Sequence, residues 1–492
     1  MSLVRIKNLT FAYDSSFDEI FQNVSFEIDT DWKLGFIGRN GRGKTTFLNL
    51  LLGKYEYSGS IHARVKFEYF PYAIKDKSKN TIDIFRDICP EAMDWEISYE
   101  LNKLDVEDTV LSRPFQTLSN GEQTKVLLAA LFLISNAFLL IDEPTNHLDT
   151  AGRDSIKNYL KKKKGFILVS HDRTLLDECV DHVLSINRAD IEVQKGNFSS
   201  WHRNKKQQDH YELVQNEKLK KEMKRLSSAA QQSKQWSDCV ESSKNGTRNS
   251  GIKPDKGYVG HKAAKMMKRS KNIEARKNSA IVEKSKLLKN IETVDSLALC
   301  PLDYHSPELL SLQNISIHYG AHAVCSHVSF SLKKGERIAL QGKNGSGKTS
   351  ILKLICGESI PFEGALQIPK GLRISYVSQD TSSLGGSLFA FAAEHKMDET
   401  QFLTILRKLD FSRTQFEKDI ADFSSGQKKK VLLAKSLCEQ AHLYIWDEPL
   451  NYIDVLSRIQ IEELILEYQP TLIFVEHDLT FAEKIATKIV TL

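Results

Sequence analysis

Two stretches of the sequence have the residue types and the spacing of a phosphate-binding loop. The pattern Gly-x-x-x-x-Gly-Lys-Thr occurs at residues 38–45 and again at residues 342–349. In such a loop the glycines let backbone N–H groups surround phosphate oxygens at a helix N-terminus, the lysine reaches the β and γ oxygens, and the threonine ligates magnesium. One match could be chance. Two matches, each followed by the same further motifs in the same order, predict a nucleotide-binding function.

A pair of carboxylates follows a continuous apolar run in each half. Asp142 and Glu143 end the first run, and Asp447 and Glu448 end the second. Such runs are typical of parallel strands buried on both faces, and α/β sheets bind ligands at the carboxyl ends of their strands. The aspartate can hold magnesium and the glutamate can activate an attacking water. A merely solvated acidic pair is the alternative, but its recurrence downstream of both phosphate loops argues against it.

The motifs repeat because the chain contains an internal duplication. Equivalent residues are separated by 304 positions at the phosphate-loop lysine, 305 at a serine and a glutamate, and 306 at a histidine. These pairs are Lys44/Lys348, Ser119/Ser424, Glu143/Glu448 and His171/His477. A nearly constant separation means two copies of one α/β domain. We therefore expect an α/β fold with two P-loop domains, at residues 1–200 and 301–492, and a linker at residues 201–300.

A third motif resembles the signature of ATP-binding-cassette (ABC) ATPases. LSNGEQ at residues 118–123 recurs as FSSGQK at residues 423–428. The Ser-x-x-Glu/Gln spacing alone marks only a helix start with a capping box. In the ABC family the serine and glycine of this motif bind the γ-phosphate held by the opposite cassette. Phe423 departs from the usual leucine, but Ser424 and Gly426 remain.

The resemblance implies ATP and Mg²⁺ as cofactors, two composite sites, and a role for each matched residue. The residues expected to bind nucleotide are Tyr13, Gly38, Asn40, Gly41, Gly43, Lys44, Thr45, Thr46, Ser119, Gly121, Tyr319, Gly342, Asn344, Gly345, Gly347, Lys348, Thr349, Ser350, Ser424 and Gly426. Those expected at the metal are Thr45, Asp142, Thr349, Gln379 and Asp447, and those expected to be catalytic are Glu143, Glu448, His171 and His477. The first site would combine Lys44 with Ser424 and Gly426, and the second would combine Lys348 with Ser119 and Gly121.

Some of these roles have simpler alternatives. Tyr13 and Tyr319 match the aromatic residue that stacks on adenine, although a single tyrosine is more often a core residue. Gln379 resembles the Q-loop glutamine, but its counterpart in the first half is Tyr72. We therefore expect the two sites to be unequal.

The charge distribution singles out the linker. Of 68 Lys and Arg and 63 Asp and Glu in the chain, residues 201–300 hold 23 and 11, which leaves 45 and 52 elsewhere. A strongly basic segment between acidic flanks suggests contact with a polyanion. Apolar residues at helical spacing predict one helix from about 201 to 235 and a second from about 260 to 293, which together form an antiparallel hairpin.

The segment between these helices is rich in Ser, Asn, Gly and Lys, and we expect a loop over residues 236–260. Its candidate RNA-contacting residues are Trp236, Lys244, Arg248, Lys253 and Tyr258. Cations contact phosphates and aromatic rings stack on splayed bases. The alternative is a solvated hairpin that only spaces the two cassettes.

Two cassettes on one chain and the string EPTNHLD at residues 143–149 resemble the ABC-F family of translation factors and ribosome-protection proteins. In that family the linker enters the ribosomal exit site and reaches from P-site tRNA toward the peptidyl-transferase centre. The resemblance implies the 70S ribosome, with its 23S rRNA and P-site tRNA, as partner, neither membrane nor permease, and a monomer whose own cassettes pair. A cytoplasmic location is expected because the N-terminal residues lack the layout of a signal peptide.

Within that family the sequence is most similar to the antibiotic-resistance branch. The stretch from Tyr72 to Leu118 is about as long as that from Gln379 to Phe423, so no arm is inserted, and the chain ends soon after His477. This combination resembles the Lsa-type proteins, which protect against lincosamides, streptogramin A and pleuromutilins. The alternatives are a housekeeping ABC-F factor for stalled ribosomes and the energy subunit of an exporter. A DNA-repair ATPase would be expected to carry zinc sites or far longer coiled coils.

Overall fold

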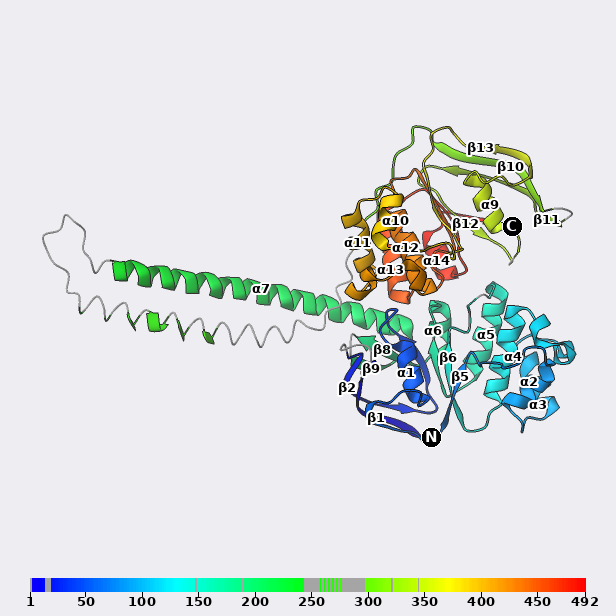
Figure 1. The fold of residues 1–492 in the computed structure, drawn as a ribbon, viewed down its shortest axis with the longest axis horizontal. Coiled ribbons are helices and arrows are strands. Elements are labelled where there is room, and N and C mark those ends of the chain that lie inside the picture. The colour runs from blue at the N-terminus through cyan, green and yellow to red at the C-terminus, as the bar shows by residue number, and fades with distance from the viewer. Residues whose placement is uncertain are drawn as a thin grey trace. The chain divides into compact units, whose positions relative to one another are not determined.

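The structure of the 492-residue chain is a computed structural model. It describes residues 2–13, 19–146, 148–187, 190–242, 297–319, 322–343 and 345–492, together with scattered residues between 257 and 276. The chain forms two compact units, one made of residues 1–199 and 294–492 and the other of residues 200–293. The first unit contains both copies of the duplicated domain, which we call the first and the second cassette (Figure 1).

The first cassette has a mainly parallel core sheet and a smaller antiparallel sheet. In the core sheet the strand order is β5-β6-β7-β3-β8-β9, and only the β8–β9 pair is antiparallel. The strands are β3 Lys33–Ile37, β5 Lys66–Phe70, β6 Ala137–Asp142, β7 Phe166–Val169, β8 His182–Asn187 and β9 Asp190–Lys195. The antiparallel sheet, with the order β2-β1-β4, contains β1 Leu3–Phe11, β2 Phe21–Asp29 and β4 Ser58–His62.

The second cassette repeats this arrangement. Its core sheet has the parallel order β14-β15-β16-β12-β17, and its antiparallel sheet has the order β11-β10-β13. The strands are β10 Glu308–Tyr319, β11 His322–Lys333, β12 Arg337–Gln341, β13 Phe362–Gln367, β14 Ile374–Val377, β15 Leu443–Asp447, β16 Leu472–Val475 and β17 Lys488–Thr491. Leu297 and Leu299 also pack into the core of this cassette. The predicted α/β fold with two cassettes is confirmed.

Helices follow the strands of both cassettes. In the first cassette they are α1 Lys44–Leu51, α2 Thr81–Ile88, α3 Asp94–Asn102, α4 Asn120–Phe132, α5 Thr150–Lys162 and α6 Arg173–Cys179. In the second they are α9 Lys348–Ile355, α10 Leu388–Glu394, α11 Glu399–Lys408, α12 Ser425–Cys438, α13 Val455–Tyr468 and α14 Leu479–Ile485.

The sheet order places the motifs at one edge. Strands β3, β6 and β7 lie side by side and parallel, so their carboxyl ends meet. The phosphate loop follows β3, Glu143 follows β6, and His171 follows β7. The side chains of β6 between its end residues are all buried, as are those of β7. A strand with this burial cannot slide without exposing apolar surface, so the sheet fixes the positions of the residues that follow its strands.

The linker begins with one long helix, α7, which spans Phe198–Ser242. The helix predicted for residues 201–235 is therefore present, but the prediction that a loop starts at Trp236 is wrong. Residues 236–242 contain neither glycine nor proline, and the first such residue is Gly246. Extending a formed helix adds one hydrogen bond per residue, so residues 236–242, which contain no helix breaker, continue the helix. The described residues between 257 and 276 are helical, and the remaining part of the predicted return helix lies outside the described residues.

Among the residues that the structure describes, no helix combines the length and the apolar character needed to cross a bilayer. Helix α7 has the length, but its sequence is rich in charged and amide side chains, which would be costly to place in the hydrocarbon core.

Two equivalent glycines allow neighbouring strands of the antiparallel sheets to approach closely. Replacing one of them tests this packing. Gly364 in β13 has a φ of 109°, and a Cβ there would lie 2.5 Å from the carbonyl oxygen of Asn314 in β10. Gly59 in β4 makes the same close approach to Asn8 in β1. Gly364→Ala should therefore lower the stability of the second cassette by about 3 kcal/mol or more, since a left-handed backbone and a backbone clash add up. Thermal unfolding of the variant measures this loss.

Gly357→Ala is the matched control. Gly357 has a φ of 89°, but no heavy atom of the described residues lies within 4 Å of its would-be Cβ. This variant should lose only about 1–2 kcal/mol, the cost of the left-handed conformation alone. Equal melting temperatures for the two variants would contradict the packing described for β10 and β13.

Candidate functional site

The first phosphate loop forms a cradle for an anion. Gly43, at the N-terminus of α1, has a φ of 92° and no side chain that could cap the helix. Gly41 has a φ of 83°, and no described heavy atom lies within 4 Å of where its Cβ would be. Lys44 is buried, and its Nζ donates to the carbonyl oxygen of Gly38 at 2.6 Å. Uncapped helical N–H groups beside a desolvated ammonium attract phosphate.

The second phosphate loop has the same geometry. Gly347 begins α9 with a φ of 87°, and the Nζ of Lys348 donates to the carbonyl oxygens of Gly342 at 2.9 Å and Lys343 at 2.8 Å. Burial lowers the pKa of both Lys44 and Lys348, although nearby carboxylates oppose the shift. Asn344 lies outside the described residues.

Oxygen donors suitable for magnesium lie beside each phosphate loop. The Thr45 hydroxyl is 3.5 Å from Asp142 Oδ2. In the second cassette Thr349 lines the cavity, and both buried carboxylate oxygens of Asp447 lack a hydrogen-bond partner among the described residues. Burial raises the pKa of both aspartates, to about 6 for Asp447. A hydroxyl next to a partly desolvated carboxylate is a donor set for a hard divalent cation, so these residues fit Mg²⁺. Sequence reasoning missed Tyr69, whose hydroxyl donates to Asp142 Oδ2 at 2.9 Å.

Both candidate catalytic glutamates adopt the same strained turn at a strand end. The φ of Glu143 is 50° and that of Glu448 is 47°. His171 Nε2 lies 3.4 Å from Glu143 Oε1, and His477 Nε2 lies 3.3 Å from Glu448 Oε1. Positive φ values at non-glycine residues cluster at functional sites, where the surrounding structure holds them. The structure thus brings each predicted glutamate and histidine together.

The two glutamates differ in their remaining partners. Glu448 Oε2 accepts from Gln379 Nε2 at 2.9 Å and from Asn451 Nδ2 at 2.6 Å. Oε1 of Glu143 has no hydrogen-bond partner among the described residues. Burial and then Asp142 raise the pKa of Glu143 to about 8. Burial also acts on Glu448, but hydrogen bonds from His477 and Gln379 outweigh it, so its pKa lies below the ordinary value.

The sheet register shows that Tyr72 occupies the position in the first cassette that Gln379 occupies in the second. Tyr69 of β5 pairs with Leu140, and Tyr376 of β14 pairs with Ile445, which is the equivalent position. Tyr72 and Gln379 both lie three residues beyond these tyrosines. Tyr72 is exposed and does not line the cavity of the first site. The amide of Gln379 lies on Glu448, so its predicted place at the metal stays a prediction.

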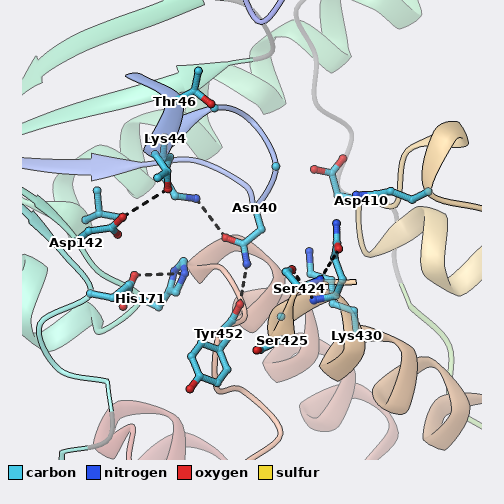
Figure 2. A pocket seen from close by; sticks show the side chains of 18 of the residues that line it. Asn40, Lys44, Thr46, Asp142, His171, Asp410, Ser424, Ser425, Lys430 and Tyr452 are labelled. Atoms are coloured by element: carbon cyan, nitrogen blue, oxygen red, sulfur yellow. Dashed lines mark hydrogen bonds and ion pairs between the residues drawn. The ribbon is translucent and has the colours of Figure 1, made fainter. Parts of the chain in front are cut away.

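The first site is a cavity of about 590 Å³ with walls from both cassettes (Figure 2). One wall carries the phosphate loop, Glu143 and His171. The other carries Ser424, Ser425 and Gly426 of the second signature. Figure 2 shows Asn40 and Tyr452 reaching toward each other between these walls. A single chain therefore supplies both halves of the site.

Short contacts join the two walls. Asn40 Nδ2 donates to the carbonyl oxygen of Tyr452 at 2.7 Å, and Asn40 N lies 3.4 Å from Asp454 Oδ2. A Cβ on Gly426 would be only 2.5 Å from that same Tyr452 carbonyl oxygen. Glycine is therefore required in the signature, because a side chain would clash with the Tyr452 backbone of its own cassette, whose carbonyl oxygen accepts from Asn40 of the other wall.

An ion pair adds to these contacts on one side of the cavity. Arg42 Nη2 lies 2.9 Å from Asp410 Oδ1, and Arg39 Nη1 lies 3.7 Å from the same oxygen. The second phosphate loop carries Lys343 and Ser346 at the equivalent positions. Sequence comparison of the halves shows this difference, but the partner Asp410 could be found only from the structure.

The second site is smaller and its walls differ. Its cavity has a volume of about 400 Å³. Lys348, Thr349, Gln379, Glu448 and His477 line it from the second cassette. Asn120, Leu148 and Arg153 line it from the first cassette. The predicted signature residues Ser119 and Gly121 do not line this cavity, although their neighbour Asn120 does.

The remaining predicted residues lie near the cavities or outside the described part of the chain. The Tyr13 hydroxyl is 2.8 Å from Thr46 Oγ1, and that of Tyr319 is 3.4 Å from Ser350 Oγ. Both signature serines form the predicted capping boxes, with Glu122 and Gln427 respectively. Trp236 lies on α7, but its side chain, together with Lys244, Arg248, Lys253 and Tyr258, lies outside the described residues.

A family profile described as ABC transporter matches residues 21–146 and 325–451, which together make up just over half of the chain. The chain belongs to the ABC transporter family. Its two matched segments are the two cassettes, each with the phosphate loop, the signature and the carboxylate pair that define an ABC ATPase.

Several curated ABC proteins are similar to the whole chain. Ribosome protection protein VmlR of Bacillus subtilis is 28% identical over 486 residues, which cover 96% of this chain and 84% of VmlR. ATP-binding protein Uup of Buchnera aphidicola is 27% identical over 515 residues, which cover 99% of this chain and 80% of Uup. Probable ATP-binding protein YheS of Escherichia coli K12 is 25% identical, covering 93% and 74%. These relatives support the ABC-F resemblance.

Solved structures share the arrangement of two cassettes. An archaeal ribosome recycling factor, aABCE1, in complex with ribosomal stalk protein aP1, has a TM-score of 0.61 at 18% identity, covering 98% of this chain and 87% of that one. A structure described as RNase-L Inhibitor has a TM-score of 0.60 at 17% identity, covering 99% and 87%. At this identity the likeness concerns the fold alone.

The unequal surroundings of the two glutamates predict unequal effects of the same substitution. Glu448→Gln should lower ATP turnover by on the order of 10²-fold, because two amides and a histidine orient Glu448 as a base. Glu143→Gln should lower turnover less, since Glu143 lacks the two amide donors. Steady-state phosphate release from the two single variants is the measurement, and equal losses would contradict it.

Gln379→Tyr is the matched test of the cause. It places the residue of the first cassette in the second and removes one donor to Glu448. Turnover should fall toward that of Glu448→Gln while ATP binding is kept. An unchanged rate would mean that the amide does not orient the base.

Proposed function

We propose that the chain is an ABC-F ATPase that hydrolyses ATP at two composite sites and couples this cycle to binding of the 70S ribosome. The observation that carries the proposal is the first cavity, in which the phosphate loop of one cassette faces the signature of the other. A nucleotide held by the loop would meet Ser424 and Gly426 directly, so its triphosphate would join the two cassettes. Binding and closure are then linked, because the ligand favours the state in which both walls contact it.

We assign each chemical role to residues that line or adjoin the two cavities. Bound Mg·ATP supplies the transferable phosphoryl group and the cation that neutralises its charge. Lys44 and Lys348 would hold phosphate oxygens, and Thr45 with Asp142, and Thr349 with Asp447, would hold the metal. Glu143 and Glu448 accept a proton from the attacking water, while His171 and His477 lie on those glutamates and face the same cavities. Loss of the terminal phosphate removes the link between the walls.

The ribosome is proposed as partner from the linker and from the relatives. Residues 201–300 carry a large excess of Lys and Arg, which suits the phosphates of structured RNA. VmlR, which matches the chain nearly end to end, is named a ribosome protection protein. We infer that the linker enters the exit site beside P-site tRNA and contacts 23S rRNA. The proposed domains are residues 1–200, 201–300 and 301–492, in a cytoplasmic monomer.

The finer proposal is protection of the peptidyl-transferase centre from lincosamide, streptogramin A and pleuromutilin antibiotics. It rests on the Lsa-type resemblance and on the name of VmlR. The second candidate is a housekeeping factor for stalled ribosomes, since Uup and YheS match the chain at similar identity and are named ATP-binding proteins without mention of protection. Growth of a gene-deleted host in lincomycin and tiamulin, with and without the gene, separates the two, because only the first predicts a change in susceptibility.

A variant that binds but does not hydrolyse ATP should stay on the ribosome. Glu143→Gln with Glu448→Gln keeps the size of both side chains and removes both bases, so the walls remain joined by bound nucleotide. With ATP this protein should co-sediment with 70S ribosomes, and with ADP it should not. The unaltered protein with ATP is the control and should co-sediment less. Wild-type turnover in the double variant would overturn the assignment of the two glutamates.

Removing residues 243–256 should separate nucleotide binding from protection. These residues lie between the end of α7 and the described part of the return segment, and every predicted nucleotide residue lies outside them. ATP binding should be unchanged and ribosome binding reduced only in part, whereas growth in lincomycin and tiamulin should fall to that of cells without the gene. Full resistance of the deletion variant would refute this division of roles.

A charge-matched pair of variants tests the contacts to RNA. The triple change of Lys244, Arg248 and Lys253 to Gln should weaken 70S binding and reduce its dependence on salt by roughly 0.7–0.9 in logarithmic slope for each phosphate that is no longer neutralised. The control changes three exposed cassette lysines, Lys75, Lys162 and Lys164, to Gln. An equal effect of both triples would show that total charge, and not the linker, governs binding.

A further inference from the structure

The signature helix of the second cassette contains a buried lysine whose counterpart in the first cassette is a threonine. Lys429 lies near the start of α12, five residues after the signature serine Ser424. Its side chain is 2% exposed, so its ammonium points into the cassette and not toward solvent. The equivalent residue of α4 is Thr124, whose hydroxyl donates to the carbonyl oxygen of Asn120 in its own helix at 2.9 Å.

Lys429 joins three elements through two backbone carbonyl groups. Its Nζ donates to the carbonyl oxygen of Ser378 at 2.7 Å and to that of Asp447 at 3.1 Å. Ser378 immediately precedes Gln379, and Asp447 immediately precedes Glu448. One ammonium therefore holds the loop that carries the amide, the strand end that carries the base, and the helix that carries the signature.

The two ends of this connection belong to different ATP sites. Gln379 and Glu448 line the second cavity, whereas Ser424 and Gly426, at the N-terminal end of the helix that carries Lys429, line the first. If nucleotide binding in the second cavity shifts the Ser378–Gln379 loop, the Lys429 hydrogen bonds would transmit this shift to α12, whose N-terminal end lines the first cavity. In α4 the threonine hydroxyl is bonded within its own helix, so it does not make this connection from the first cassette to the second.

The surroundings make this connection stiff. Burial lowers the pKa of Lys429, and the carboxylates of Glu476, Asp447 and Glu448 act against that shift. A buried ammonium that loses one acceptor pays a large desolvation cost, so its two carbonyl partners tend to move with it. The next residue, Lys430, adds a second anchor, because its Nζ donates to Asp454 Oδ2 at 3.0 Å.

We propose that Lys429 is a positioning residue that couples the nucleotide state of the second ATP site to the signature motif of the first, and that Thr124 of the first cassette makes no equivalent link. The proposal rests on the proposed binding of ATP at both sites. Coupling of binding is reciprocal, so occupancy of either site raises the affinity of the other by the same factor. Because the connection passes through one ammonium, a single substitution should remove most of that factor.

The test measures this factor in the full chain without ribosomes. The parent is the Glu143→Gln/Glu448→Gln protein, so that nucleotide is not consumed. Calorimetric ATP titrations of the parent, of the parent with Lys348→Ala and of the parent with Lys44→Ala give the affinity of both sites together and of each alone. The coupling factor is the ratio between the ATP affinity of a site in the parent, where the other site is also filled, and the affinity of the same site when the other is disabled. We expect about tenfold or more in the parent, within the usual range of coupled sites.

In the Lys429→Thr background the factor should fall to within about twofold of one, while each single-site affinity stays near its parent value. Lys429→Arg, which keeps a buried cation and several donors, should retain coupling. Thr124→Val at the equivalent position of α4, and Lys428→Thr one residue earlier on α12, should leave the factor unchanged. A loss of fold would lower every affinity together, so a selective loss of coupling identifies a positioning role.

Other results would contradict either the proposed coupling or the proposed function. An unchanged factor in Lys429→Thr with intact single-site affinities overturns the proposal, as does a parent that binds two ATP molecules independently. If Lys429→Thr does not fold, Lys429→Met, of similar length and without a charge, takes its place. If neither binds ATP at either site, Lys429 is a structural residue and the proposal is wrong. Failure of the parent itself to bind ATP would instead refute the proposed function.

Discussion

A phosphate loop contacts a bound phosphate chain from one side only, so the donors for its other side have to come from elsewhere. The rest of the structure depends on this constraint. Uncapped N–H groups of α1 and the Lys44 ammonium face a cavity that their own cassette leaves open. The missing wall has to come from a second cassette in a fixed orientation. The duplication supplies that cassette on the same chain, and Asn40 of the first cassette donates to the Tyr452 carbonyl oxygen of the second. Pairing within one chain avoids the entropy cost of bringing two molecules together.

The two cassettes differ in the residues that line their shared sites. The first site has more contacts between its walls, and the second has more hydrogen-bond donors on its glutamate. The first site is joined across its walls by Asn40–Tyr452 and Arg42–Asp410, and a further ion pair, Arg173–Glu462 at 2.6 Å, links the cassettes. The second site has the better-oriented base, with Gln379 and Asn451 on Glu448. The first site thus has the stronger side-chain contacts across its walls, whereas the second has more donors on its glutamate.

The sequence predicts the fold and most of the site because both depend on local patterns. Glycine spacing, an apolar run ending in carboxylates and a constant offset between motifs place Lys44, Asp142 and His171 at one sheet edge without knowledge of contacts. Asp410, Tyr452 and Lys429 could not be predicted, since their roles come from what tertiary packing places beside them. The loop predicted to start at Trp236 is wrong for another reason, because Ser and Asn favour a loop although residues 236–242 contain no glycine or proline that would stop the helix.

The first turn of α7 is held to the first cassette by two hydrogen bonds. Ser199, in that turn, donates its N–H to Asp177 Oδ1 and its hydroxyl to Asp177 Oδ2, both at 2.6 Å. Asp177 belongs to α6, which begins two residues after His171. An aspartate at a helix N-terminus satisfies free N–H groups and favours the helix dipole, so α6 fixes where α7 begins. One short helix, α6, thus follows the strand end that carries His171 and accepts the two hydrogen bonds from Ser199.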